Sequence, residues 1–222
     1  MSKIKVFCFG FGQVAKYFVK KIIKEKQALE LNVSSRKKTH ISTFEGIDLN
    51  SYEFNNKKID KNIDVKIQEA DFILVSIPPI NDEDIVVANF KKIIKKTNAK
   101  WITYLSATSV YGNHDGEWVN EDSETKPTST NGIRRLKAED QWLKFSSENN
   151  IPLQIFRLSG IYSEENNILK RLISGQAKII KKKNHFFSRI HVEDIANILF
   201  ESLNKFKTSE IYNICDNKPA SQ

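Results

Sequence analysis

The residues best suited to chemistry gather in one stretch, "WITYLSATSVYGNHDGEW", which spans residues 101–118. It begins as an apolar run of the kind that forms a buried strand and then turns into small hydroxyl residues, which include Thr108 and Ser109. A hydroxyl at a strand end can hydrogen-bond a substrate oxygen, and Tyr111 and His114 can each carry a proton. Each of the last two has an ordinary alternative, because Tyr111 can be a packing residue and His114 can lie in an exposed loop.

A glycine pattern near the N-terminus predicts a phosphate-binding turn. The letters "GFGQVA" stand between an apolar run and an amphipathic one, as in the G-x-G-x-x-G/A pattern. Gly10 permits a tight turn, and Gly12 lets a pyrophosphate approach the backbone. The helix that follows offers free N–H groups and the positive end of its dipole. We expect Gly10, Gly12, Gln13 and Val14 to bind a dinucleotide; the alternative is a tight strand-to-helix turn without a ligand.

The second apolar run ends in residues that favour one nicotinamide cofactor over the other. An NAD site usually has an Asp or Glu about 20 residues after the glycines. Here Ser34, Ser35 and Arg36 stand at that place, followed by Lys37 and Lys38. Hydroxyls and cations suit a 2′-phosphate, which an Arg can hold with two parallel hydrogen bonds. We therefore expect NADP, with NAD and an ordinary basic loop as the alternatives.

These residues need a scaffold that brings strand ends together. Apolar runs alternate with amphipathic, Lys-rich segments, which predicts strands at 4–10, 29–36, 71–79, 101–108 and 152–160 and helices at 13–26, 84–96 and 131–148. Nearly continuous apolar strands joined by helices indicate a parallel sheet covered on both faces. The prediction is an α/β fold with a Rossmann-type, doubly wound parallel sheet.

The alternation of strands and helices becomes less regular after Gly160. Residues 166–180 predict a helix and a short strand, residues 191–203 a helix, and residues 211–216 a last strand. Residues 37–68 are weakly patterned, with one short strand expected near Ile47. We expect an NAD(P)-binding core over residues 1–163 and a small C-terminal substrate lobe over residues 164–222, which returns segments to the core within one compact unit.

A pair of prolines marks a further strand end. Pro78 and Pro79 stop the strand ladder and leave a rigid turn. Ligands of open α/β sheets bind outside the carboxyl ends of the strands. We expect Ser76, Ile77 and Pro78 beside the adenosine half of the cofactor; a stiff surface turn explains them equally well.

Composition limits the partners. The net charge of +8 is spread along the chain, which indicates a Lys-rich solvated surface and, secondly, attraction to an anionic ligand. No compact basic block alternates with aromatic residues, so we expect no nucleic-acid partner. Cys8 and Cys215 lie in apolar runs without metal-type spacing, which fits a reduced, cytoplasmic protein. No apolar run approaches the roughly 18 residues that span a membrane, so no membrane partner is expected.

Seven motifs occur in an order typical of one family. They are "GFGQVA", "SSR", "SIPP", "YLSATSVYGNHDGEWVNE", "RRLKAEDQW", "RLSGIY" and "SRIHVEDIA". The chain resembles the NAD(P)-dependent epimerase/dehydratase family, as an atypical extended short-chain dehydrogenase/reductase. The resemblance implies a cofactor across the strand ends and a polar small-molecule substrate such as a nucleotide sugar. The resemblance also leaves a homodimer open as one oligomeric state, since pairing through helices is common in the wider family.

The resemblance implies catalytic residues as well. The family uses a Tyr whose pKa is lowered by a Lys four residues later, together with a Ser or Thr that hydrogen-bonds the substrate oxygen. Lys137 matches the Lys, and its charge is also expected to hold the nicotinamide ribose. Ile133 stands where the Tyr is expected, and Ala107 where the hydroxyl is expected. Neither side chain can move a proton.

Substitutes are available nearby. A one-residue shift of the alignment brings Ser106 or Thr108 into the hydroxyl role, and Tyr111 lies beyond the same strand end. We therefore predict a non-standard site, with an incomplete Ser-Tyr-Lys triad, in which the catalytic residues are Thr108, Tyr111 and Lys137.

Further residues are assigned by the resemblance. Leu105, Ser106, Leu158 and Gly160 are expected to contact the cofactor. Arg134 and Arg189 are expected to face an anionic substrate, although Arg134 and its neighbour Arg135 can also form a solvated helix face. No metal site is expected, because His191 and the acids after it read as a helix start with no third ligand indicated.

The sequence leaves two candidate functions. The first is an NADP(H)-binding epimerase, dehydratase or reductase. The second is a dinucleotide-binding sensor or interaction module without catalysis, which the replacement of Tyr and Ser by Ile133 and Ala107 favours.

Overall fold

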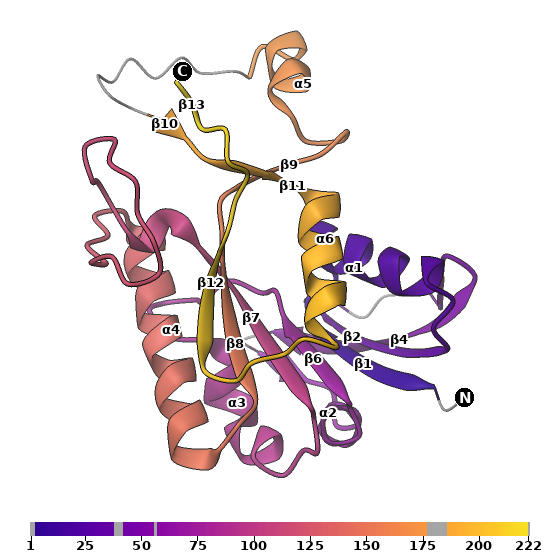
Figure 1. The fold of residues 1–222 in the computed structure, drawn as a ribbon. Coiled ribbons are helices and arrows are strands. Elements are labelled where there is room, and N and C mark those ends of the chain that lie inside the picture. Colours follow the sequence, from indigo (N-terminus) through magenta and orange to yellow (C-terminus); the bar gives the residue numbers. More distant parts are fainter. Residues whose placement is uncertain (1–2, 38–41, 56, 177–185, 222) are drawn as a thin grey trace.

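The computed structural model describes residues 3–37, 42–55, 57–176 and 186–221. A single large sheet forms its centre, with helices on both faces and a small lobe beyond one end of the strands (Figure 1). Lys38 and the short strand expected at the end of residues 166–180 lie outside the described residues.

The central strands run parallel to one another. They are β1 (Ile4–Phe9), β2 (Leu29–Ser35), β4 (Ile47–Asn55), β6 (Phe72–Val75), β7 (Trp101–Ala107), β8 (Leu153–Leu158) and β12 (Glu210–Ile214). The order across the sheet is β12-β8-β7-β6-β1-β2-β4-β3. Phe9 at the end of β1 therefore stands between Ser34 of β2 and Val75 of β6. The winding reverses at β1 and β6, which makes their carboxyl ends the topological switch point where open α/β sheets bind ligands.

Helices cover both faces, as the doubly wound prediction requires. One face carries α1 (Gln13–Lys24) and α6 (Val192–Ser202), and the other carries α2 (Ile63–Gln68), α3 (Ile85–Ile94) and α4 (Thr130–Asn149) (Figure 1). Side chains alternate along β1, so Cys8 packs in the first layer while Phe7 and Phe9 pack in the second. Phe9 meets Phe90 of α3 with ring centroids 5.3 Å apart. Each such buried side chain stabilises the fold by about 1.5–3 kcal/mol.

Short polar signals set the ends of the helices. Asp84 begins α3 by accepting hydrogen bonds from the backbone N–H groups of Val86 and Val87, both at 3.0 Å. Burial raises the pKa of Asp84 in spite of these bonds. Ser129 begins α4 in the same way, and the helix ends at Asn150, which has a left-handed backbone.

The weakly patterned region holds more structure than its sequence predicts. In place of one short strand near Ile47, it forms the nine-residue β4, two short antiparallel partners, β3 (Thr43–Phe44) and β5 (Lys58–Ile59), and α2. Only Leu49 and Phe54 are buried along β4. A strand near the edge of a sheet needs few apolar residues, so its periodicity is faint.

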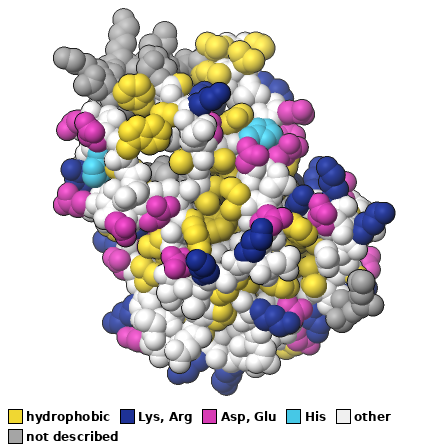
Figure 2. Space-filling view, in the orientation of Figure 1, with side chains coloured by type: hydrophobic (Ala, Val, Ile, Leu, Met, Phe, Trp, Pro, Cys, Tyr) yellow, Lys and Arg dark blue, Asp and Glu magenta, His cyan; other side chains and the backbone are white. Residues whose placement is uncertain are grey.

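The lobe stands above the carboxyl ends of the central strands (Figure 1). It contains β9 (Gly160–Tyr162) paired with β11 (Arg189–His191), β10 (Phe186–Phe187) paired with β13 (Ala220–Ser221), and α5 (Ile168–Ile173). Apolar side chains gather at the surface over α5 (Figure 2), where Ile168, Leu169, Leu172 and Ile173 are all exposed. None of the helices in the described part of the chain is long and apolar enough to cross a membrane.

Candidate functional site

The glycine turn sits at the switch point and is held from both neighbouring strands. Gly10 has a φ of +86°, in the left-handed region that favours glycine. Its N–H donates to Ser34 Oγ at 3.1 Å, and Ser76 Oγ donates to the carbonyl of Gly10 at 3.1 Å. A Cβ on Gly10 would lie 2.7 Å from Ile77 Cγ2. The turn is therefore tight, and the hydroxyls of Ser34 and Ser76 bond to it.

The next glycine leaves open space. Gly12 begins α1 with an extended backbone and no side-chain cap, and the first turn of the helix contains no acid. A Cβ on Gly12 would meet no atom of the described residues within 4 Å. Free N–H groups, a positive dipole end and empty space together form a site that suits a phosphate. Val14 is buried in the core, and Gln13 Nε2 donates to Ser163 Oγ at 2.5 Å, so Gln13 joins α1 to the turn after β9.

The end of β2 carries positive charge. Arg36 is exposed, and no ion pair joins its guanidinium to another residue of the described part. Ser35 Oγ donates to the carbonyl of Lys37 at 2.5 Å. Glu53 lies beside Ser35 on β4, but Lys58 Nζ is 2.7 Å from its carboxylate and offsets its charge.

The loop after β6 is fixed to the outer side of α4. Asp82 accepts from Lys137 Nζ at 3.1 Å and from Arg134 Nε at 3.3 Å. The bond from Lys137, and then that from Arg134, hold the pKa of Asp82 below its usual value. Pro78 is exposed in this loop. Lys137 and Arg134 thus serve a surface contact in this structure.

Another cation reaches the end of β7. Arg135 Nη1 donates to the carbonyl of Leu105 at 2.5 Å and lies 3.3 Å from the hydroxyl of Tyr104. The guanidinium carbon is 5.8 Å from the centre of the Tyr104 ring, within the range of a cation–π contact. Burial raises the pKa of Tyr104, which keeps its hydroxyl neutral. Asn131, Arg135 and Glu139 recur every fourth residue, so one face of α4 carries all three.

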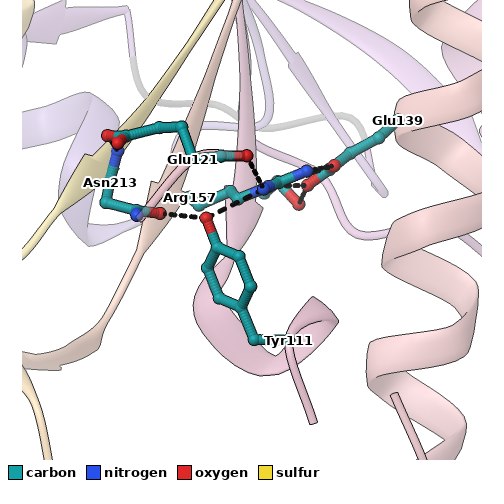
Figure 3. A network of polar contacts seen from close by, with 6 residues as sticks. Tyr111, Glu121, Glu139, Arg157 and Asn213 are labelled. Carbon is teal, nitrogen blue, oxygen red and sulfur yellow. Dashed lines mark hydrogen bonds and ion pairs between the residues drawn. The ribbon is translucent and has the colours of Figure 1, made fainter. Parts of the chain in front are cut away.

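The same face of α4 enters a buried polar network (Figure 3). Glu139 and Arg157 form an ion pair at 2.8 Å, and their side chains are 1% and 5% exposed. Burial opposes the charge of Arg157, but the hydrogen bonds that it donates to Glu139 and Tyr111 outweigh this effect and raise the pKa of the guanidinium. Glu139 also accepts from Ser106 Oγ at 2.5 Å. The pair therefore links α4 to both β7 and β8.

Tyr111 belongs to this network. Its hydroxyl accepts from Arg157 Nη1 at 2.8 Å and donates to Asn213 Oδ1 of β12 at 2.7 Å. The carboxylate of Glu121 accepts from the N–H of Asn213 at 2.6 Å. The Tyr111 side chain is 2% exposed, and the guanidinium carbon of Arg157 lies 4.9 Å from the centre of the Tyr111 ring. The hydroxyl proton of Tyr111 is therefore donated to Asn213 in this structure.

The other candidates lie around the same strand ends. Thr108 and Ser109 fall in a 3-10 turn, η1 (Thr108–Val110), and among the described residues no hydrogen bond engages their hydroxyls. His114 Nε2 lies 3.1 Å from the carbonyl of Glu124 in the following loop. Leu158 is buried at the end of β8. Exposed Arg189 stands beside Gly160, its neighbour in the β9–β11 pair. Within the described residues, no three His, Cys, Asp or Glu side chains are placed to hold a metal.

Sequence reasoning missed four network residues, Glu121, Glu139, Arg157 and Asn213. The signal for Arg157 was present, because an Arg inside the apolar run "PLQIFRLSG" must bury its charge beside a carboxylate. Its partner lies 18 positions earlier on a helix, and no spacing rule connects the two. Asn213 carries no such signal.

Comparison with known proteins identifies the family. The model of the NAD dependent epimerase/dehydratase family matches residues 10–215. The chain belongs to this family. Membership carries with it an NAD-dependent, epimerase-like role, and it confirms the resemblance drawn from the motifs. A search of curated proteins found no match.

Solved structures agree on the fold. A conserved protein of unknown function from Silicibacter pomeroyi DSS is 30% identical, with a TM-score of 0.82 over 97% of this chain and 73% of that one. The UDP-glucuronic acid 4-epimerase of Bacillus cereus, solved with NAD, is 16% identical, with a TM-score of 0.81 over 98% of this chain and 80% of that one. The UDP-N-acetylglucosamine 4-epimerase of the same organism is 16% identical, with a TM-score of 0.74 over 99% of this chain and 80% of that one. At that level of identity, the two epimerases support the Rossmann architecture.

Proposed function

We propose that this protein binds NADP(H) and acts on a polar, nucleotide-linked small molecule with a non-standard catalytic site. The observation that carries the proposal is the turn at Gly10, which places the open backbone of Gly12 and the start of α1 at the switch point. Phosphate groups of a dinucleotide fit there by charge and by space.

The preference for NADP rests on Arg36. Its guanidinium is exposed at the end of β2, and the nearest acid in the register, Glu53, is offset by Lys58. An Arg can bind a 2′-phosphate with two hydrogen bonds. Replacing Arg36 with Leu should lower the affinity for NADPH about tenfold, or 1.4 kcal/mol, and should change the affinity for NADH by less than about twofold. A titration of nicotinamide fluorescence measures both, and equal losses would contradict the preference.

The geometry supports Arg135, in place of Lys137, as the cation beside the cofactor. Arg135 bonds to the end of β7, whereas Lys137 bonds to Asp82 in an exposed loop. Four residues before Arg135 stands Asn131, an amide that does not titrate near neutral pH. Thr108 then offers the available hydroxyl for a substrate oxygen. A homodimer stays a prediction, to be tested by analytical ultracentrifugation.

The neighbours support a nucleotide sugar as the substrate to test first. The two Bacillus cereus proteins are named for UDP-sugars. The decisive experiment loads the protein with NADP⁺ or NAD⁺ and adds UDP-glucose, UDP-glucuronic acid or UDP-N-acetylglucosamine. Formation of enzyme-bound reduced nicotinamide, or of the epimer, supports an enzyme.

One observation favours the second function, a binding module without turnover. The hydroxyl of Tyr111 is held by Arg157 and Asn213, so it is not free to accept a substrate proton. Tight dinucleotide binding with no reduced cofactor from any of the three sugars would favour this alternative. Absence of dinucleotide binding would overturn both.

A further inference from the structure

We infer that the buried ion pair of Glu139 and Arg157 positions the 3-10 turn η1 against the cofactor, so that both are positioning residues for the site. The inference rests on the proposed function, because the turn carries Thr108. It adds a role for two buried residues that lie on α4 and β8.

The ion pair fixes both ends of the segment that contains η1. Through Glu139 it holds Ser106, which precedes the turn, with a bond of 2.5 Å. Through Arg157 it holds Tyr111, which follows the turn, with a bond of 2.8 Å. Between these two points, the hydroxyls of Thr108 and Ser109 are not engaged by other residues of the described chain. A segment tied at both ends presents its middle in one orientation.

The start of α4 adds a third contact. A Cβ on Gly132 would lie 2.5 Å from the carbonyl oxygen of Ser109, so only a glycine lets the helix approach the turn this closely. Gly132 and Glu139 are two helical turns apart, and Gly132 lies against η1 while Glu139 bonds to β7. Helix α4 therefore supports the turn from one side along its length.

A buried ion pair is a weak way to stabilise a protein. Desolvating two charges costs several kcal/mol each, and well-packed apolar residues of similar volume often serve as well. All three nitrogens of the Arg157 guanidinium nevertheless donate to oxygens, on Glu139, on Tyr111 and on the carbonyl of Glu121. Such a network specifies geometry more than it contributes free energy.

The test compares the whole cofactor with a fragment of it. The double variant Glu139→Gln/Arg157→Met removes both charges at nearly constant volume, so it avoids an unpaired buried charge. The probes are NADPH and 2′-phospho-ADP-ribose, which lacks the nicotinamide. We expect the dissociation constant of NADPH to rise about tenfold and that of the fragment to change less than about twofold. A merely structural role would weaken both equally, and that result, or no change in either, would overturn the inference.

Hydrogen exchange provides a readout that needs no ligand. Amides of residues 105–112 should exchange at least about tenfold faster in the double variant, while the thermal midpoint stays close to that of the unmodified protein. If the unmodified protein binds no dinucleotide, the proposed function fails and this measurement alone decides the inference. Unchanged exchange in residues 105–112 would overturn it.

Matched controls separate this effect from general loosening. Gln154 lies on the same strand as Arg157, is equally buried, and bonds to Thr103 at 2.7 Å and Ser202 at 3.1 Å on the other face. Gln154→Leu should lower the thermal midpoint without changing the ratio of the two affinities. If the double variant does not fold, Tyr111→Phe removes only the hydroxyl between Arg157 and Asn213. It should shift the same ratio by about threefold, and an unshifted ratio overturns the inference.

Discussion

Two regions at the carboxyl ends of the strands, the glycine turn after β1 and the polar network at the ends of β7 and β8, differ in which atoms shape them. At the glycine turn the shape comes from backbone, with Gly12 open and short hydroxyls from Ser34 and Ser76 holding Gly10. At the network it comes from long side chains of separate segments, centred on Arg157 and Glu139.

The difference has a physical reason. A phosphate is bound by backbone N–H groups, so the glycine turn needs side chains small enough to leave these groups accessible. An oriented hydroxyl at a strand end depends on its neighbours, and charged side chains fix such neighbours through directional bonds. Substitutions at the glycine turn should therefore act directly on phosphate binding. Substitutions in the network should act on folding and geometry and, through these, on binding of the whole cofactor.

The largest effect is expected from Glu139→Gln alone. The change leaves the charge of Arg157 buried without a counter-charge, which should cost about 3–5 kcal/mol of unfolding free energy. Urea unfolding followed by circular dichroism measures the loss. The double variant with Arg157→Met should recover most of it, and a single variant as stable as the unmodified protein would break the comparison.

The second effect should appear in binding without a change in stability. Gly12→Val adds a side chain where no described atom lies within 4 Å, so folding should be unaffected while the phosphate is displaced. Affinity for NADPH should fall at least about 100-fold, or 2.7 kcal/mol. Calorimetry and a thermal melt check the two halves of this prediction. Gly10→Val is the matched variant and should lose both affinity for NADPH and thermal stability, because its Cβ would clash with Ile77.

A smaller effect distinguishes the two cations of α4. Arg135→Leu should weaken NADPH binding about tenfold, whereas Lys137→Leu should change it less than about twofold. The reason is position, since Arg135 bonds to the carbonyl of Leu105 and Lys137 to Asp82. Parallel fluorescence titrations test the pair. A larger loss for Lys137→Leu would restore it to the role that the motif assigned.

The smallest effect uses the two cysteines, because Cys8 lies two residues before Gly10 and Cys215 two residues after Asn213. Burial raises the pKa of the Cys8 thiol to about 12, and partial burial followed by the charges of Asp216 and Glu121 raises that of exposed Cys215. Because the thiolate is the reactive form, a disulfide reagent at pH 8 should modify Cys215 slowly and faster as the pH rises, and should leave Cys8 intact.

The same thiols report on the network. The double variant at Glu139 and Arg157 should speed the reaction of Cys215 by about threefold, because Asn213 loses its neighbours, and should leave Cys8 unchanged. Timed mass spectrometry of the two thiols gives both rates. Faster reaction of Cys8 would show that the network and the glycine turn do not move independently.

The fold was largely predictable because its signals are local. The glycine pattern, the apolar strands and the strand-helix alternation each occupy a few consecutive residues, and the structure places β1, α1, β2, α3, β7, α4 and β8 close to where the pattern indicated. Strand β6 lies in the expected place but ends at Val75, so the expected extension to Pro79 is wrong. The region around β4 was underestimated because a strand with few buried residues has a faint period. The candidate cation on α4 could be assigned from sequence only by counting from a motif. A two-residue difference in that count moves a side chain to the opposite side of a helix.

By itself the sequence determined the architecture, the glycine turn and the family, because backbone-driven features depend on residue type and short spacing. The tertiary structure alone decided which side chains meet at the ends of β7 and β8. Glu139 and Arg157 come from a helix and a strand, and Tyr111 and Asn213 lie 102 positions apart. Hydrogen bonds between such distant segments depend on the packing of the whole sheet, and no local pattern encodes them.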